Sequence, residues 1–571
     1  MVLNKKVAQI FYEIAQLLDL IGDNPFRLRA YERAAMRVES MPEDLEEYVL
    51  QDKLEELPGI GRDLAEKIKE VYRTGTLKQY EELKQKVPSG LLEMMSIPGL
   101  GPKKIKLIYD KLGITTMEEL EKYAREGRLR SLSGFGPKTE ENILKGIEFL
   151  KRSKGRLPLG QVLPLAIDLR RYIEESGLVK RVDVVGSIRR FKETVHDVDI
   201  LVVTDSPREI MDRFVRYPEV EEIIAQGEKK SSIIASGVQV DLRVFDEECY
   251  GAALLYFTGS KEHNIRVRQV CIERGLKLNE YGLFQGERRV AGASEQEVYS
   301  YLGMQWIPPE MREDQGEVEI ALQGQLPVLI DLEDIKGDLH IHTVYSDGTD
   351  EIETIVKKAI SLGYKYVAIT DHSPSLAVAK GMTVEKVRRQ AEEIARINRR
   401  YSKIRVLLGM EVDILADGTL DCPEDVLNCL DVVIAAVHSR FKMGREEMTN
   451  RIIKAISHPK VNILAHPTGR LLGERESYEV DMERVMRVAK EKGVAMELNA
   501  SPRRLDINSE MCRMAKEMGV MVAINTDAHS HQQLDYMRFG VGTARRGWLE
   551  KKDVLNTLES DRLMGFLRKE R

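Results

Sequence analysis

The sequence predicts a multidomain protein: an all-α amino-terminal region, an α+β middle region and a carboxyl-terminal α/β barrel. Three patterns indicate it. Residues 1–155 form helical periods joined by glycine-containing turns, residues 156–246 contain β-rich apolar runs, and strands alternate with helices from residue 336 onward. A chain of 571 residues is also too long for one hydrophobic core.

The composition is that of a globular protein without a membrane span. Hydrophobic residues make up 43% and charged residues 32% of the chain, and there is no run of about 18 uncharged apolar residues. The five cysteines are scattered without a CxxC pair, which indicates a reducing cytoplasm. Residues 1–155 hold 27 Lys and Arg against 26 Asp and Glu, so the charge balance does not indicate a nucleic-acid binder, and any such contact there would have to come from local geometry.

Three segments of the helical region repeat one pattern, two glycines flanking an apolar residue. They are residues 57–61, 97–101 and 132–136, with the glycines Gly59, Gly61, Gly99, Gly101, Gly134 and Gly136. Two glycines let the backbone turn tightly, and the next helix offers free N–H groups to an anion. This is the helix-hairpin-helix pattern, which holds a DNA phosphate through backbone donors. Three ordinary helix-turn-helix connections are the alternative.

The middle region carries an Asp-X-Asp motif on the predicted strand 197–203. Alternation puts Asp197 and Asp199 on one strand face, and Asp241 lies on the predicted strand 238–245. Three carboxylates can hold two divalent ions such as Mg²⁺ for in-line attack on phosphorus. The preceding turn, with Gly186, Ser187 and Arg190, can cradle and clamp phosphates. The alternative is a solvated strand edge.

Seven apolar strands are predicted in the last region, ending near Ile341, Thr370, Val412, Val437, Ala465, Leu498 and Thr526. Six of them end in one or more potential metal ligands, namely His340, His342, Asp347, His372, Glu411, His438, His466, Asp527 and His529. Functional groups of a β/α barrel gather where the strands end. Imidazole with carboxylate suits Mn²⁺, Zn²⁺ or Fe²⁺, so we expect one polynuclear site. A domain that keeps metals for stability only is the alternative.

The runs GSIRR, HDVDILVV, VDLRVF and YFTGSKEHN resemble the family X DNA polymerases, and the nine-ligand module resembles the polymerase-and-histidinol-phosphatase (PHP) domain. Both in this order resemble the bacterial and archaeal family X polymerases. The resemblance covers nearly the whole chain and implies six parts. These are a 5′-phosphate or lyase-like domain (1–85), a helix-hairpin-helix DNA-binding domain (86–155), a nucleotidyltransferase palm (156–246), a thumb (247–315), a linker (316–335) and a PHP domain with a distorted (β/α)7 barrel (336–571).

The resemblance also implies residue roles. Asp197, Asp199 and Asp241 would form the catalytic triad, with Asp241 taking the proton from the primer 3′-hydroxyl. Nucleotide or template contacts would come from Gly186, Ser187, Arg190, Tyr256, Phe257, Gly259, Asn264 and Arg268. Lys67 matches the Schiff-base lysine of the gap-filling relatives. Asp63, one helical turn earlier, would favour its charged form, so 5′-phosphate binding is the alternative role.

For the barrel, the resemblance implies up to three metals. His340, His342, Glu411 and Asp527 would hold the first; Glu411 would bridge to a second held by His438 and His466; Asp347, His372 and His529 would hold a third. It implies a manganese-favoured 3′–5′ exonuclease, with abasic-site or 3′-phosphate hydrolysis as further activities. Asn499 and Arg503, after the sixth strand, are candidates for substrate contact.

The sequence thus predicts a DNA-directed DNA polymerase that fills short gaps in base excision repair, with an attached exonuclease. Gapped or nicked DNA and dNTPs would be its partners, with Mg²⁺ or Mn²⁺ at the palm and Mn²⁺ or Zn²⁺ at the barrel, in a cytoplasmic monomer. A DNA-binding scaffold with a structural metal domain would need acids missing from the triad, and none is missing. A small-molecule phosphatase would need neither the glycine turns nor the YFTGS run.

Overall fold

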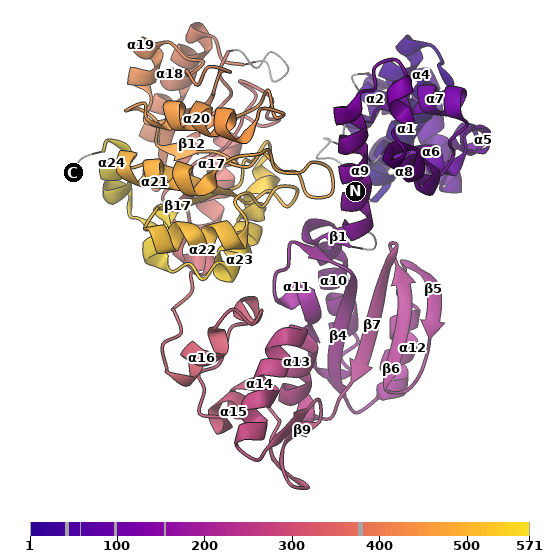
Figure 1. The fold of residues 1–571 in the computed structure, drawn as a ribbon, viewed down its shortest axis with the longest axis vertical. Coiled ribbons are helices and arrows are strands. Elements are labelled where there is room, and N and C mark those ends of the chain that lie inside the picture. The colour runs from indigo at the N-terminus through magenta and orange to yellow at the C-terminus, as the bar shows by residue number, and fades with distance from the viewer. Residues whose placement is uncertain are drawn as a thin grey trace. The chain divides into compact units, whose positions relative to one another are not determined.

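The structure is a computed structural model that describes residues 2–39, 45–57, 59–95, 97, 100–153, 156–374 and 381–569. The chain folds into two units, Met1–Lys154 and Gly155–Arg571 (Figure 1). Among the described residues, no helix is both long enough and apolar enough to cross a membrane.

The first unit is helical, as predicted. Its α-helices are α1 (Val2–Ile21), α2 (Pro25–Glu39), α3 (Leu45–Leu50), α4 (Arg62–Thr74), α5 (Lys78–Lys86), α6 (Ser89–Met94), α7 (Pro102–Leu112), α8 (Met117–Arg125) and α9 (Pro137–Ser153). One hydrophobic core extends from Val7 to Ile147. Helices on both sides of the predicted boundary at residues 85 and 86 share this core, and the boundary itself stays a prediction.

One backbone hydrogen bond recurs in the three glycine turns. In each, the apolar residue between the glycines donates its N–H to the carbonyl three residues earlier: Ile60 to Leu57 (3.0 Å), Leu100 to Ile97 (3.0 Å) and Phe135 to Leu132 (3.1 Å). Helices α4, α7 and α9 begin directly after the second glycine of each turn. The sequence repeat predicted that the three turns are equivalent. Gly99 lies outside the described residues.

The palm is built on a five-stranded sheet with the order β2-β4-β7-β6-β5. Its strands are β2 (Val179–Val184), β4 (Asp197–Thr204), β5 (Val220–Ala225), β6 (Lys230–Ala235) and β7 (Val238–Val244), and it carries α10 (Leu159–Glu174), α11 (Gly186–Arg189) and α12 (Pro207–Val215). Alternate residues of β4 and β7, such as Val198 and Val240, share a core with α10 and α12. The residues between them therefore face the other side of the sheet.

The thumb region follows the palm. Helices α13 (Tyr250–Thr258), α14 (Lys261–Glu273), α15 (Glu295–Tyr301) and α16 (Glu317–Leu322) accompany a small antiparallel sheet of β8 (Lys277–Asn279), β9 (Gly282–Gln285) and β10 (Arg288–Ala291). The α13 residues Tyr250 and Ala253 pack on Leu201 and Val203 of β4, on the sheet face opposite the main palm core.

The carboxyl-terminal part is a sheet of seven parallel strands in sequential order. The strands are β11 (Gly337–Asp338), β12 (Tyr366–Ile369), β13 (Arg405–Asp413), β14 (Val432–Ala436), β15 (Ile463–Leu464), β16 (Ala495–Asn499) and β17 (Val522–Asn525). Isolated pairing of Ile341 with Ala528 brings the first and last strands together, so the barrel is nearly closed. All seven strands occur where the apolar runs predicted them, although β11 stops before His340.

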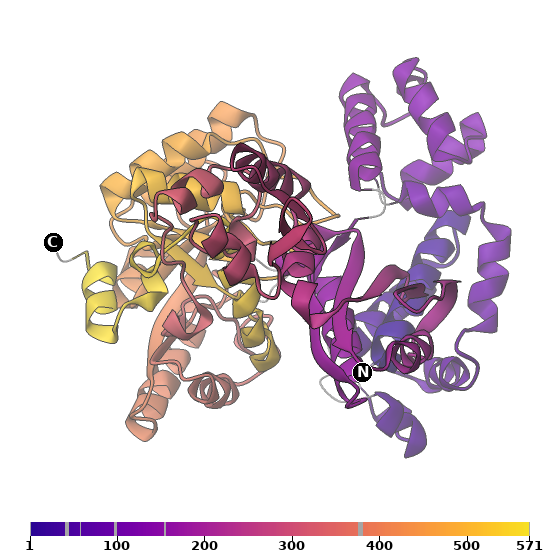
Figure 2. The same ribbon diagram turned by 90° about the horizontal axis from the view of Figure 1, so that it is seen from below.

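Helices surround this barrel and close one end of it. They are α17 (Ile352–Ser361), α18 (Val384–Arg400), α19 (Glu424–Cys429), α20 (Arg445–Ile456), α21 (Met482–Lys492), α22 (Ser509–Met518), α23 (Met537–Arg546) and α24 (Ser560–Leu567), drawn mostly in orange and yellow (Figure 2). Leu563 and Leu567 of α24 pack in the inner core with Leu407 and Ile434. The opposite end of the barrel, where the strands finish, carries polar side chains.

Candidate catalytic and metal sites

The three palm aspartates lie on one face of the sheet. Asp199 on β4 is the direct neighbour of Asp241 on β7, and Asp197 is two residues before Asp199. Their apolar neighbours point to the opposite face and form the palm core, which forces the carboxylates outward. The shared face was predicted for Asp197 and Asp199, and the parallel pairing with Asp241 completes the triad.

The electrostatics differ between two of these aspartates. Burial and the nearby charges of Asp197 and Asp241 raise the pKa of Asp199 to about 6. Burial also acts on Asp241, but Lys230 (2.7 Å) and Arg243 (3.3 Å) lie at its Oδ2 and the net direction of its pKa is downward. Gln239 donates to Asp241 Oδ1 at 3.2 Å. A like-charge cluster of this kind is stabilised by a cation.

The turn that precedes β4 packs directly against the triad. Gly186 has a φ of 67°, and a Cβ there would lie 3.2 Å from Oδ2 of Asp199. Glycine is therefore required both by the backbone conformation and by the approach to the carboxylate. The guanidinium of Arg190 pairs with Glu313 at 3.0 Å and donates to the Thr258 carbonyl. In this structure the side chain of Arg190 thus contacts residues of the thumb region.

The predicted nucleotide residues of the thumb gather around the end of α13. The rings of Tyr256 and Phe257 are edge-on at 5.1 Å, and Asn264 donates to the Tyr256 carbonyl at 2.7 Å. The Asn264 side-chain oxygen is buried and has no hydrogen-bond partner among the described residues. Arg268 donates to the Asn264 carbonyl at 3.2 Å. A buried unused acceptor calls for a donor from a ligand.

All nine predicted barrel ligands converge at the carboxyl ends of the strands. Ligand atoms lie within 4.8 Å of one another in three overlapping sets: His340, His342 and Asp527; His372, Glu411 and His438; and His342, Asp347, His372 and His529. His466 joins through its Nε2, 2.9 Å from Oε1 of Glu411. Among the described residues, such sets occur only at the barrel, and the palm carboxylates are less tightly grouped.

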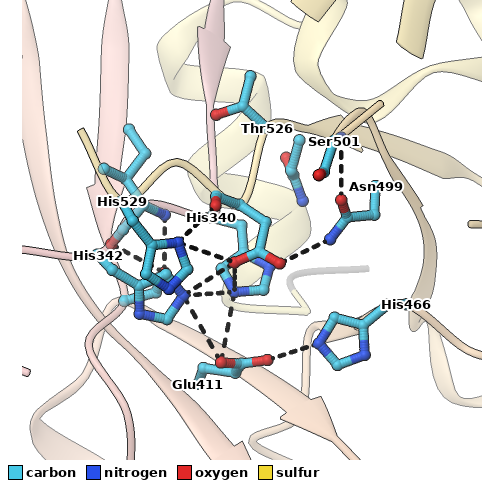
Figure 3. A network of polar contacts seen from close by, with 12 residues as sticks. His340, His342, Glu411, His466, Asn499, Ser501, Thr526 and His529 are labelled. Carbon is cyan, nitrogen blue, oxygen red and sulfur yellow. Dashed lines mark hydrogen bonds and ion pairs between the residues drawn. The ribbon is translucent and has the colours of Figure 1, made fainter. Parts of the chain in front are cut away.

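Glu411 contacts other ligands of this cluster through both of its carboxylate oxygens (Figure 3). Its Oε2 is 2.8 Å from His372 Nδ1 and 3.6 Å from Nε2 of His342, whereas its Oε1 is 3.3 Å from Nε2 of His438 and 2.9 Å from that of His466. One carboxylate thus faces imidazoles on both sides. The resemblance implies a metal-bridging role for Glu411, and that role stays a prediction.

The donor set fits metal ions. Nδ1 of His342 is buried without a hydrogen-bond partner in the part of the chain that the structure describes, and Oε2 of Glu411 lies among imidazoles there without a hydrogen bond of suitable geometry. Burial and the neighbouring imidazoles lower the pKa of His342 to about 3. Burial also acts on His372, but Glu411 and Asp347 outweigh it and raise the pKa of His372 to about 10. Metals bind neutral imidazoles and ionised carboxylates, so a bound ion would take the place of the proton that Glu411 and Asp347 favour on His372.

Two ligands have an unusual backbone. His466 and Asp527, two residues after β15 and β17, have φ angles of 26° and 54°. Left-handed backbone is uncommon for residues other than glycine and is concentrated at functional sites. These turns aim both side chains into the barrel mouth, where the ligands meet.

Several supporting residues were not predicted from the sequence. Glu497, fully buried on β16, contacts His340 Nδ1 at 2.7 Å and accepts the His466 N–H at 2.8 Å. Asp413 contacts Nδ1 of His438. Such partners fix the ring orientation of metal-binding histidines. Their only sequence signal is a carboxylate inside an apolar strand.

Lys67 lies on α4 beside Asp63 and under the ring of Tyr31, 5.3 Å from its centroid. Burial lowers the pKa of Lys67, but Asp63 and Tyr31 outweigh this effect and the net pKa lies above its ordinary value. A protonated amine cannot form a Schiff base. The geometry therefore favours the phosphate-binding alternative.

We expect borohydride trapping of Lys67 on DNA with a 5′-deoxyribose phosphate to be weak at neutral pH and stronger in Asp63→Asn. Removing the carboxylate lowers the lysine pKa, and each unit gives about a tenfold larger neutral fraction. Lys69→Ala, which removes a neighbouring lysine paired with Glu66, is the control. Equal trapping of the wild type and Lys67→Ala would exclude Lys67 as the nucleophile.

Four family models match the chain. They are a helix-hairpin-helix domain (residues 2–77), a SAM-like helix-hairpin-helix tandem (91–148), the DNA polymerase beta thumb (253–313) and the PHP domain (338–501). With the paired palm carboxylates and the nine-ligand barrel, they define a nucleotidyltransferase of the DNA polymerase type joined to a PHP metal domain.

Relatives extend this assignment. The chain is 39% identical over 570 residues to the DNA polymerase/3′-5′ exonuclease PolX of Bacillus subtilis, covering 99% of both chains. It therefore belongs to the PolX family, the family X DNA polymerases with a PHP domain, as the sequence motifs predicted. It is 26% identical over 349 residues to DNA polymerase lambda of Arabidopsis thaliana (54% of this chain, 62% of the relative). A probable phosphatase of Thermoanaerobacter is 29% identical over 235 residues (38% of this chain, 89% of the relative).

Proposed function

We propose that this protein is a DNA-directed DNA polymerase that fills short gaps in repair, and that its barrel is a metal-dependent 3′–5′ exonuclease. One observation carries the proposal: a single chain holds two separate groups of acidic ligands, one on the palm sheet and one at the barrel mouth. The full-length similarity to a polymerase/exonuclease supports pairing these two activities.

In the palm, the three aspartates would hold two Mg²⁺ or Mn²⁺ ions. Divalent ions supply positive charge that stabilises the phosphorus centre during in-line transfer. Burial opposes ionisation of Asp241, but hydrogen bonds from Lys230 and Gln239 lower its pKa, and the ionised carboxylate is the form that would accept the primer 3′-hydroxyl proton. Gly186 and Ser187 would place the triphosphate over the carboxylates.

In the barrel, the nine ligands would hold up to three Mn²⁺ or Zn²⁺ ions. These ions supply a hydroxide nucleophile and neutralise phosphate oxygens. Glu411 positions the imidazoles on both of its sides. Similarity of this domain to a probable phosphatase supports including 3′-phosphate hydrolysis in the proposal, and abasic-site hydrolysis is included on the sequence resemblance alone.

Gapped or nicked DNA and dNTPs are the proposed substrates of a monomeric protein. A Cβ at Gly59, Gly61, Gly101, Gly134 or Gly136 would meet no atom within 4 Å. The space beside these turns is therefore open to a DNA backbone that approaches the helix amino termini. The five cysteines are all free thiols, which supports a cytoplasmic location.

We expect a gapped duplex with a 5′-phosphate to be extended about tenfold better than a simple primer–template at limiting protein. Helix amino termini each contribute a modest part of the binding of a phosphate. Primer extension on both substrates, with a 5′-hydroxyl gap as control, measures this preference.

Gly61→Ala tests whether the preference for the 5′-phosphate gap depends on the first glycine turn. Gly61 has a φ of −85°, which alanine also adopts, and the added methyl group would point into open space. The variant should fold normally yet lose the 5′-phosphate preference. Equal extension of all three substrates by the wild type would contradict anchoring of the 5′ end.

A further inference from the structure

Arg504 lies at the edge of the barrel ligands, after β16. Its Nε is 3.6 Å from Oδ2 of Asp527. The other oxygen of Asp527, Oδ1, lies 3.1 Å from Nε2 of His342 and 3.6 Å from Nε2 of His340. One side of this carboxylate therefore faces the metal ligands, and the other side faces the guanidinium.

Asp527 does not depend on Arg504 for its position. Asn499 donates to the same Oδ2 at 3.0 Å and is itself held by the Ser501 N–H at 3.1 Å. A metal at Oδ1 would offset the remaining negative charge of Asp527. The positive charge of Arg504 would then be available to bind another anion.

The donors of Arg504 are free to bind such an anion. Its side chain is 20% exposed, and in the described part of the chain its nearest acidic group is Asp527, beyond ordinary hydrogen-bond length. A guanidinium offers five N–H donors in a planar fork that matches phosphate oxygens. A mostly buried fork beside metal ligands is suited to bind an oxyanion in two-point contact.

A second arginine lies nearby. Arg475 donates from Nε to the Gly469 carbonyl at 2.8 Å, and its guanidinium lies 4.3 Å from the centroid of the Phe441 ring. Burial and the positive charge of Arg504 lower the pKa of Arg475. The positive charges of Arg475 and Arg504 therefore repel each other, and a bound anion would relieve this repulsion.

The adjacent arginine has a different environment. Arg503, singled out from the sequence, is 68% exposed and pairs with both oxygens of Glu474 at 2.7 and 2.8 Å. Its charge is already neutralised on the surface. Neighbouring arginines thus give a matched pair in which only Arg504 faces the ligands.

We propose that Arg504 binds the non-bridging oxygens of the terminal phosphodiester of a DNA strand in the barrel mouth. The proposal rests on the exonuclease function and deepens it by naming what holds the substrate. Arg504 would orient the phosphorus toward the metal ligands, and its charge would offset the charge that builds on the phosphate oxygens.

The test uses full-length, Mn²⁺-loaded wild type, Arg504→Ala, Arg504→Lys and the control Arg487→Ala, an exposed arginine that pairs with Glu483 on α21. Calorimetry measures the affinity for inorganic phosphate, metal analysis measures bound manganese, and a labelled strand measures exonuclease kcat and KM. We expect Arg504→Ala to weaken phosphate binding and to lower kcat/KM about 10- to 100-fold, the scale of charged hydrogen bonds. Bound manganese should not change, Arg504→Lys should recover part of the loss, and Arg487→Ala should match the wild type.

Two results would overturn the proposal. One is equal phosphate affinity in the wild type and Arg504→Ala. The other is loss of manganese from Arg504→Ala, which would make Arg504 a support for Asp527. A wild type that degrades no DNA would contradict the proposed exonuclease, while phosphate calorimetry would still decide the role of Arg504.

Discussion

Asp199→Asn is expected to abolish primer extension and to spare the exonuclease. Asp199 is the central carboxylate of the palm triad, beside Asp241 in the register of β4 and β7. Losing a metal-holding charge removes several kcal/mol of transition-state stabilisation, or about a thousandfold or more in rate. Extension and degradation of one labelled gapped duplex would measure both activities.

The same substitution is expected to stabilise the metal-free protein. Burial and two nearby aspartates raise the folded-state pKa of Asp199 to about 6, above its ordinary value of 3.8. The fold therefore disfavours the charged form, and this group costs stability progressively as pH rises from about 4 to 6. At pH 7, asparagine should add about 1–3 kcal/mol to the free energy of unfolding, and much less at pH 4.

Urea unfolding in EDTA at the two pH values measures this gain. Asp205→Asn is the control, because Asp205 is exposed and pairs with Lys180 outside the triad. If Asp199→Asn keeps extending primers, the palm triad is not the polymerase site. If Asp199→Asn loses the exonuclease as well, the two activities do not have separate sites. If Asp199→Asn leaves the free energy of unfolding unchanged at pH 7, the repulsion between Asp199 and the other two palm carboxylates would be contradicted.

Glu411→Ala is expected to remove the exonuclease and to leave primer extension unchanged. The buried carboxylate contacts imidazoles on both sides, and these histidines hold its pKa well below the usual range. Its loss would remove the carboxylate that lies between the predicted metal-binding imidazoles, so hydrolysis should fall about a thousandfold or more. Bound manganese should fall as well.

His342→Ala should behave in the same way, because His342 belongs to two of the three ligand sets. His531→Ala is the control: His531 pairs with Asp350 at 2.8 Å and is absent from those sets. Primer extension reports that each variant is folded. Full exonuclease activity in Glu411→Ala would exclude this cluster as the hydrolytic site.

Much of the fold and the ligand set could be predicted from the sequence for a physical reason. Strands buried on both faces are continuous apolar runs, and polar residues at their ends stand out from them. His438 and His466 follow such runs directly, and parallel strands bring their ends to one side of the barrel. Strand alternation likewise placed Asp197 and Asp199 on one face.

The remaining features depend on pairings between distant residues that no periodic pattern marks. Glu497 orients His340 across 157 positions, and Arg190 meets Glu313 across 123. Arg503 and Arg504 are chemically identical in the sequence, and only the loop conformation after β16 decides which one faces Asp527. The finer domain boundaries and the individual site roles stay predictions.

The most direct test of two phosphorus-directed metal sites in one chain is anomalous diffraction from crystals grown with a gapped DNA, a non-hydrolysable dNTP and saturating Mn²⁺. Peaks are expected between Asp197, Asp199 and Asp241 and, separately, around Glu411 at the barrel mouth. A barrel mouth without peaks, or palm carboxylates turned away from one another, would contradict the account.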